Sequence, residues 1–380
     1  MGMDRRWWAM GATAASLLVV GLDMTILNVA LPDIAVDLNA SGAQLQWFAD
    51  AYLLVLSALL LPSGMLGDRF GRKRFTVAGL LVFGAGSLWC AFAATPEALI
   101  AARVVLGVGA AVLVPLAMSS VVVLFEPVER PKAIVVLGGA TMIGLPLGPI
   151  VAGVLLQHYW WGSVFLINVP VIAAALGLVL AFLPESRAGV SHRARRFDGV
   201  GVVLSSTGLV GFTYGVIEGP ERGWADPLVV GCLAGSVVVL TTFFLWERTL
   251  RGAEPVFDSA LWRVPAFRWG SLGAAVASLA FFGVMFVVPQ YLRGVLGSDA
   301  LGTGLRSLPM VVTLIAGLRV TMLLLPRFGA KALGTAGFLV AAAGLALGTR
   351  VSVDSGYWLT ACWTAVTGAG VGAALFASQN

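Results

Sequence analysis

Long apolar runs, each of a length that can cross a lipid bilayer, constrain the fold of this chain more than any other feature. A helix needs about 20 apolar residues to cross a hydrocarbon core roughly 30 Å thick. Twelve such runs lie at residues 8–31, 44–66, 75–95, 97–124, 133–157, 163–183, 199–218, 227–246, 269–292, 301–325, 332–349 and 356–378. The sequence therefore predicts an all-α polytopic membrane protein, with a polar stretch at 184–196 after the sixth span.

Composition excludes an ordinary soluble protein. Apolar residues make up 59% of the chain and charged residues 11%, whereas a soluble domain has roughly 45–50% and about 25%. The net charge of +5 does not indicate a nucleic-acid partner, because the basic residues stand between apolar runs and not on one solvated surface. The three cysteines all lie within apolar runs, which indicates buried side chains and neither a disulfide framework nor a metal site.

The basic residues assign an orientation to these spans, because short cytoplasmic loops collect Lys and Arg. If the N-terminus is inside, the cytoplasmic segments hold 18 of the 24 basic residues, and the external loops hold only Arg222, Arg293 and Arg350. The first run follows two arginines, as in a signal peptide, but it is about twice as long and lacks a small-residue cleavage site. We therefore expect a retained first helix.

Two acidic residues lie within predicted spans. Asp23 stands about two thirds of the way along the first span, followed by Thr25 and Asn28. A carboxylate at such depth costs roughly 2.5–3.5 kcal/mol on insertion scales, so it normally marks an ion or substrate path. The alternative for Asp23 is a structural hydrogen bond that holds the bundle together. Asp50, followed by Tyr52 in the outer part of the second span, is a second candidate, unless it lies shallow enough to be hydrated.

The loop between the second and third spans has the sequence GMLGDRFGRKR at residues 64–74. Its glycines permit a tight reversal, and its alternating charges can form a breakable ion-pair network with a facing helix end. The residues predicted for such a gate are Gly64, Asp68, Arg69, Gly71, Arg72 and Lys73. A positive-inside anchor is the alternative, although that role requires a far less particular pattern.

Arg103 lies several residues into the fourth span, where a guanidinium needs a carboxylate, a carbonyl or water. We expect it to act on Asp23 or to hold substrate, and snorkelling to the outer face is the alternative.

The fifth span contains Gly144, Gly148, Pro149 and Gly153. Such residues allow close packing and bending where two halves of a transporter rock, although a generic small-residue packing face is the alternative.

In this order and spacing, these motifs resemble the major facilitator superfamily, and within it the fourteen-helix drug:proton antiporters. The resemblance is carried by the segment 22–32, the loop 64–73, Arg103 with the glycines that follow it, and the segment 148–153. The segments 165–170 (FLINVP), 197–199 (FDG), 254–255 (EP) and 304–309 fit the same subgroup.

The resemblance implies a six-helix N-terminal bundle at 1–183, a cytoplasmic loop and inserted helix pair at 184–250, and a C-terminal bundle at 251–380. The substrate cavity would lie between the bundles, which rock to alternate access. The family's proton-linked acid maps onto Asp23 and its fourth-helix arginine onto Arg103, while Asp50 stays a second candidate for proton coupling from its place in the second span. The family's gating loop maps onto the loop 64–73, and its antiporter motif maps onto Gly144, Gly148, Pro149 and Gly153. The cavity candidates are Thr25, Asn28, Tyr52 and Asn168. No cofactor is implied, because the proton gradient supplies the energy.

The chain also departs from the family pattern. Leu106 stands where the family usually has Gln, Trp161-Gly162-Ser163 replaces Trp-Arg-Trp, and the second-half echo of the gating loop, at 326–329, lacks its carboxylate. The family would continue with two further helices, whereas this chain ends at Asn380. We therefore expect a C-terminal truncation.

Together these features favour a monomeric, proton-coupled exporter of amphipathic drugs or other small organic compounds in the cytoplasmic membrane of a bacterium. Transport is favoured over catalysis because the two histidines, His158 and His192, fall at loop positions and no nucleophile or metal-ligand cluster accompanies the intramembrane acids. The alternatives are a proton-linked solute symporter, a dedicated metabolite exporter, and a transport-dead receptor, scaffold or truncated remnant.

Overall fold

A computed structural model describes residues 3–186, 196–249, 253–254, 261–352 and 355–379. Within these residues, eleven helices are long and apolar enough to cross a membrane. In chain order the helices are α1 (Met3–Asp37), α2 (Gly42–Phe70), α3 (Arg72–Ala91), α4 (Pro96–Leu124), α5 (Arg130–His158), α6 (Ser163–Leu166), α7 (Asn168–Phe182), α9 (Gly199–Arg222), α10 (Pro227–Thr249), η1 (Leu261–Arg263), α11 (Pro265–Gly294), α12 (Ala300–Gly348) and α13 (Tyr357–Ser378). The predicted all-α membrane class is confirmed, and β1 (Arg196–Phe197) and β2 (Ala253–Glu254) add only a two-residue parallel pairing.

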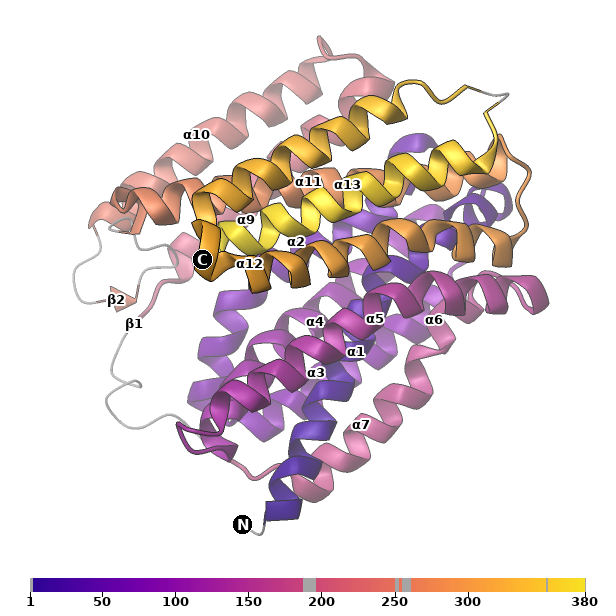
Figure 1. Cartoon of the computed structure of the whole chain (residues 1–380). Helices are drawn as coiled ribbons and strands as arrows, with labels where there is room; N and C mark the ends of the chain where they lie inside the picture. The colour runs from indigo at the N-terminus through magenta and orange to yellow at the C-terminus, as the bar shows by residue number, and fades with distance from the viewer. Residues whose placement is uncertain (1–2, 187–195, 250–252, 255–260, 353–354, 380) are drawn as a thin grey trace. The chain divides into compact units, whose positions relative to one another are not determined.

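The twelve predicted spans are all helical, and one of them, the sixth, is interrupted. The sixth span consists of α6 and α7, which are separated at Ile167. The tenth and eleventh spans run together in α12, which contains two helices joined at Gly329. Gly329 has φ 74° and ψ 160°, a conformation that costs glycine little, and Figure 1 shows α12 reversing its direction.

Side-chain caps fix where several helices begin. Ser41 accepts a hydrogen bond from the Gln44 backbone N–H, and the Gln44 side chain accepts one from the Ser41 backbone N–H. This reciprocal capping box satisfies donors that the first turn of α2 leaves open. Thr95 caps α4, and Asp299 caps α12, in the same position. The connections on these sides are therefore short and well defined.

Contacts between residues divide the chain into two compact units. Unit 1 contains Met1–Asp23, Ile34–Gly144 and Gly162–Ser259, and unit 2 contains Met24–Asp33, Leu145–Trp161 and Ala260–Asn380. Helices α1 and α5 therefore contribute one part to each unit. The three-part division at 183/184 and 250/251 stays a prediction, and its second boundary, like His192, lies outside the described residues.

Each unit has its own packing core. In unit 1, α4 packs against α2 and α3, and a Cβ added to Gly109 would lie only 2.6 Å from the Phe83 backbone nitrogen. In unit 2, α11, α12 and α13 enclose an apolar core around Phe281, Met310 and Val371.

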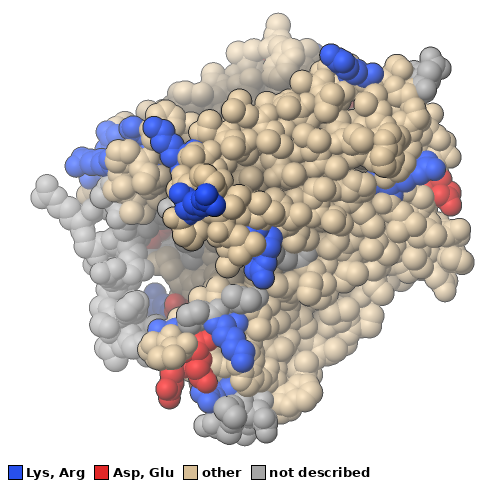
Figure 2. All heavy atoms as spheres, viewed as in Figure 1, with Lys and Arg blue, Asp and Glu red and all other residues tan. Residues whose placement is uncertain are grey.

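Figure 2 shows Lys and Arg gathered at helix ends, while the long sides of the helices carry almost no charge, as expected of helices surrounded by lipid.

Candidate functional site

A buried ion pair in unit 1 joins the first and fourth spans. Asp23 on α1 is fully buried and Arg103 on α4 is 2% exposed, and the Arg103 Nη1 donates to Asp23 Oδ2 at 2.7 Å. Two charges removed from water require close contact and additional hydrogen bonds to be tolerated. The guanidinium turns inward to a carboxylate, so Arg103 does not snorkel to a helix end.

Helix α2 supplies two further contacts to Arg103. The Nε donates to the Phe48 carbonyl at 2.7 Å, and the guanidinium carbon lies 4.5 Å from the centre of the Tyr52 ring. The ring face is the electron-rich side of an aromatic residue and attracts a cation. Arg103 is therefore held from α2 as well as by Asp23, so the loss of one partner does not leave it without the others.

Helices α7 and α3 complete this charge cluster, defined here as Asp23, Arg103, Tyr52, Asn168 and Ser87. The Asn168 side-chain amide donates to Ser87 Oγ at 3.2 Å and lies 3.5 Å from Asp23 Oδ1. Asn168 is 1% exposed and Ser87 is fully buried. Sequence reasoning named Asn168 and Tyr52 as cavity candidates but gave no sign of Ser87 or of the Phe48 carbonyl.

Glycines bring α4 close enough for these contacts. A Cβ at Gly107 would lie 2.7 Å from the Tyr52 carbonyl oxygen, and a Cβ at Gly86 would lie 2.8 Å from the Leu106 backbone nitrogen. A side chain at either position would press against the backbone of the neighbouring helix, and a backbone cannot rotate out of the way as a side chain can. The glycines that follow Arg103 thus set the depth at which its guanidinium meets Asp23.

Three other predicted site residues are Asp50, Thr25 and Asn28. Asp50 is partly buried, and within the described residues it makes no ion pair with Arg103. Thr25 donates to the Leu145 carbonyl at 2.9 Å within unit 2. Asn28 is 7% exposed, and its amide lies 3.5 Å from the Met24 carbonyl of its own helix.

The predicted gating loop connects α2 and α3 at Gly71, whose φ of 125° is unfavourable for other residues. Arg72 Nε donates to Asp68 Oδ1 at 2.6 Å across this turn. Arg69 is exposed and lies over the Phe70 ring at 5.6 Å. A Cβ added to Gly64 would lie 3.2 Å from the Pro115 side chain, so this part of α2 packs on α4.

The loop also contacts the last turn of α7 and the segment that follows it. Lys73 Nζ donates to the Leu180 carbonyl at 2.7 Å, and Arg74 lies 3.5 Å from Glu185. The Lys73 backbone N–H donates to the same carboxylate, at 3.3 Å. Sequence reasoning missed Glu185, because a single acid after a span has no distinctive spacing. The loop charges therefore have partners within unit 1.

The predicted antiporter motif on α5 contacts a different helix at each end. A Cβ at Gly144 would lie 2.7 Å from the Leu18 carbonyl of α1, within unit 1. A Cβ at Gly153 would lie 2.9 Å from the Leu301 Cα of α12, within unit 2. Gly148 and Pro149, between them, are buried. The motif is therefore where α5 passes from one unit to the other.

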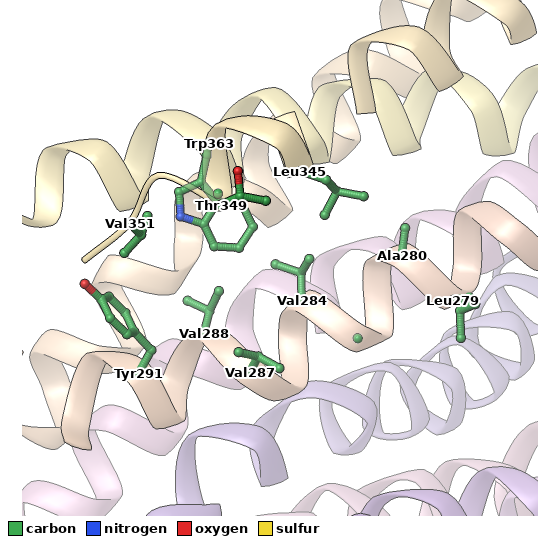
Figure 3. Close-up of a pocket in the computed structure, with 12 residues that line it drawn as sticks. Leu279, Ala280, Val284, Val287, Val288, Tyr291, Leu345, Thr349, Val351 and Trp363 are labelled. Atoms are coloured by element: carbon green, nitrogen blue, oxygen red, sulfur yellow. The ribbon is translucent and has the colours of Figure 1, made fainter. Parts of the chain in front are cut away.

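An apolar pocket of about 600 Å³ lies within unit 2. Valines of α11 line one wall, and Tyr291 and Trp363 stand toward one end (Figure 3). None of the predicted site residues lines it. Its walls are of the kind that binds apolar parts of small molecules.

Comparison with known proteins identifies the family. A family model described as Major Facilitator Superfamily matches residues 13–380. The tetracenomycin C resistance and export protein of Streptomyces glaucescens is 34% identical over 367 residues, which are 97% of this chain and 68% of that protein. The puromycin resistance protein pur8 of Streptomyces alboniger is 37% identical, over 92% of this chain and 69% of that protein.

The multidrug efflux pump LfrA of Mycolicibacterium smegmatis is 37% identical over 83% of this chain, which spans 62% of LfrA. Among solved structures, a bacterial homologue of the human lysosomal transporter Spinster, inward-facing and unoccupied, matches with a TM-score of 0.64 and 18% identity, over 100% of this chain and 75% of that one. At that identity the likeness shows the fold alone. With the family model matched along nearly its whole length, this chain belongs to the major facilitator superfamily of transporters.

Proposed function

We propose that this chain exports small organic compounds across the cytoplasmic membrane of a bacterium in exchange for protons. The relatives support the substrate class, because they are named for tetracenomycin C, puromycin, cephamycin and actinorhodin, and one is named a multidrug efflux pump. The distribution of Lys and Arg supports an N-terminus inside the cell. We take the monomer as the transporting species.

The observation that carries the exchange mechanism is the buried pair of Asp23 and Arg103. An intramembrane carboxylate normally marks an ion path. A proton that binds Asp23 removes its negative charge and weakens its attraction to Arg103. The Phe48 carbonyl and the Tyr52 ring still hold the guanidinium, so the cluster survives the change in charge. Proton binding and release can therefore alternate with substrate movement without unfolding the site.

The proton gradient supplies adequate energy for this exchange. One charge moved through 100 mV gives about 2.3 kcal/mol, and roughly 1.4 kcal/mol corresponds to a tenfold ratio of concentrations. One net charge per cycle thus supports about a 40-fold substrate gradient per 100 mV. One or two protons per molecule are sufficient for useful export.

The test uses purified protein in proteoliposomes with ethidium as an amphipathic cationic probe. Asp23→Asn keeps the shape of the side chain but cannot exchange a proton. We expect it to abolish both ethidium movement driven by a pH gradient and ethidium-induced proton release. Asp50→Asn tests the second candidate acid, and because Asp50 makes no ion pair with Arg103 within the described residues, we expect this variant to retain at least half of the wild-type rate. Intact exchange in folded Asp23→Asn protein would refute the assignment.

The direction of coupling separates export from the symport alternative. An antiporter moves protons and substrate in opposite directions across the membrane, whereas a symporter of this kind moves both inward. Accumulation of the probe on the side that protons enter would favour the symporter. Absence of any coupled movement with puromycin or ethidium, in protein that folds, would favour the receptor or scaffold reading.

A further inference from the structure

One ion pair in unit 2 joins residues that are 260 positions apart in the sequence. Arg293, in the last turn of α11, donates through Nη1 to Asp33 Oδ2 near the end of α1. The two side chains are 21% and 32% exposed. Partial burial keeps water and salt from fully screening the attraction, yet leaves the pair accessible enough to separate.

Further contacts within unit 2 hold the early segments of the chain to its later helices. The segment 24–33 of α1 is tied to α5 by the hydrogen bond from Thr25 to the Leu145 carbonyl. The continuing part of α5 packs on α12, where a Cβ at Gly153 would lie 2.9 Å from Leu301 Cα. Two helix segments from early in the chain are thus fastened to the helices that follow residue 260.

Helix α1 contributes residues to both units. It is one helix from Met3 to Asp37, and its first part belongs to unit 1, where Asp23 is paired with Arg103. Its segment 24–33 belongs to unit 2. If the first part of α1 moves, the helix must therefore bend after Asp23 or Asp33 must move away from Arg293. A pair of opposite charges at such a point favours the conformation in which they touch.

We propose that Asp33 and Arg293 form an external latch that favours the outward-closed conformation and separates when the transporter opens to the outside. This inference rests on the proposed export function and on its orientation, which places the end of α1 outside the cell. Neither residue carries a proton or contacts substrate in this role. They set how often the outer side opens, as positioning residues of the transport cycle.

The experiment measures outward opening directly. Ala152 precedes Gly153 on α5 and is fully buried. A cysteine introduced by Ala152→Cys, in a background lacking the three native cysteines, therefore reacts only when this part of α5 becomes exposed. A membrane-impermeant maleimide is added outside intact cells, and the labelling rate is followed. We expect Asp33→Asn and Arg293→Gln each to raise the rate about threefold, which corresponds to roughly 0.7 kcal/mol. High salt should raise the rate of the unmutated pair in the same direction.

Matched controls separate the ion pair from general damage. Arg350→Gln removes an exposed external arginine outside this pair and should leave the rate unchanged. The double variant Asp33→Asn with Arg293→Gln should label no faster than either single variant, because the pair can be lost only once. The charge-swapped variant Asp33→Arg with Arg293→Asp should restore slow labelling, which a variant that merely folds badly would not do.

Two results would overturn the latch. Unchanged labelling in both single variants would show that the pair does not restrain opening. Fast labelling in the charge-swapped variant would show that the residues act for another reason than their attraction. Because labelling needs neither substrate nor a proton gradient, absence of ethidium export by the unmutated protein would remove the proposed function without changing these outcomes.

Discussion

Arg103 illustrates how one planar side chain can organise several helices. Its Nη1 reaches Asp23 on α1, its Nε reaches the Phe48 carbonyl on α2, and its face lies on the Tyr52 ring. A guanidinium presents these donors in a fixed fork, whereas a lysine ammonium is a compact charge on a flexible stem. The arrangement therefore requires arginine and not merely a positive charge.

The substitution Arg103→Lys tests this requirement. We expect it to lower the free energy of unfolding by about 1–3 kcal/mol, because at least one buried acceptor loses its donor, and to reduce export. Thermal unfolding in detergent measures the effect. The matched control is Arg222→Lys, since Arg222 also pairs with a carboxylate, Glu218, but is 47% exposed; this substitution should leave the free energy of unfolding nearly unchanged. Equal losses of stability in the two variants would contradict the proposed role of the planar guanidinium of Arg103.

The sequence predicted only part of the charge cluster, for reasons that follow from chemistry. Asp23 and Arg103 stand out because a charge inside an apolar run is costly. The Phe48 carbonyl and Ser87 do not, because every residue has a carbonyl and serines are common in helices. Asp50 is also an acid within an apolar run, but within the described residues Arg103 pairs with Asp23 and not with Asp50, because the facing of the helices, and not composition, decides which acid meets the arginine.

At the scale of helices, glycine positions govern how closely α5 and α1 approach. A Cβ at Gly144 would lie 2.7 Å from the Leu18 carbonyl oxygen and 2.9 Å from the Leu22 backbone nitrogen, whereas a Cβ at Gly138 meets nothing within 4 Å. Both glycines lie on α5 in unit 1. Because the two glycines share a helix but differ in their surroundings, the effects of the same substitution at each position can be compared directly.

Alanine at these two positions should therefore have opposite effects. Gly144→Ala is expected to destabilise the protein by about 1–3 kcal/mol, because backbone atoms must move apart. Gly138→Ala is expected to be neutral or to stabilise it by about 0.5–1 kcal/mol through better helix propensity. Thermal unfolding of the two variants side by side measures the difference. Equal destabilisation would mean that helix flexibility at α5, and not close approach to α1, is what Gly144 provides.

The helix boundaries show what apolar runs can and cannot predict. Every predicted span is helical, because a run long enough to cross lipid has to satisfy its backbone hydrogen bonds internally. The break between α6 and α7 was not predicted, and the reversal between the spans 301–325 and 332–349 was predicted without the backbone conformation of Gly329 that makes it. Both depend on local backbone geometry, which hydropathy does not encode. Likewise, the pair of Asp33 and Arg293 depends on how α1 and α11 pack.

For the whole molecule, the distribution of charge makes a prediction about orientation. The loop after α3 and the loop after α4 lie at opposite ends of one span, and they expose Ala94 and Val128 respectively. The distribution of basic residues predicts that the first loop lies outside the cell and the second inside. Ala94→Cys and Val128→Cys, each in a background without native cysteines, therefore probe the two sides of the membrane through small, uncharged changes.

An impermeant maleimide added to intact cells should label Ala94→Cys and leave Val128→Cys unlabelled until the cells are permeabilised. The physical reason is that transferring the arginine-rich segments 69–74 and 130–132 across the membrane is opposed by their charge. Labelling after permeabilisation is the control for reactivity at each cysteine. Labelling of Val128→Cys alone in intact cells would invert the orientation, which would turn the external latch into an internal one and make Asp23 accessible from the opposite side.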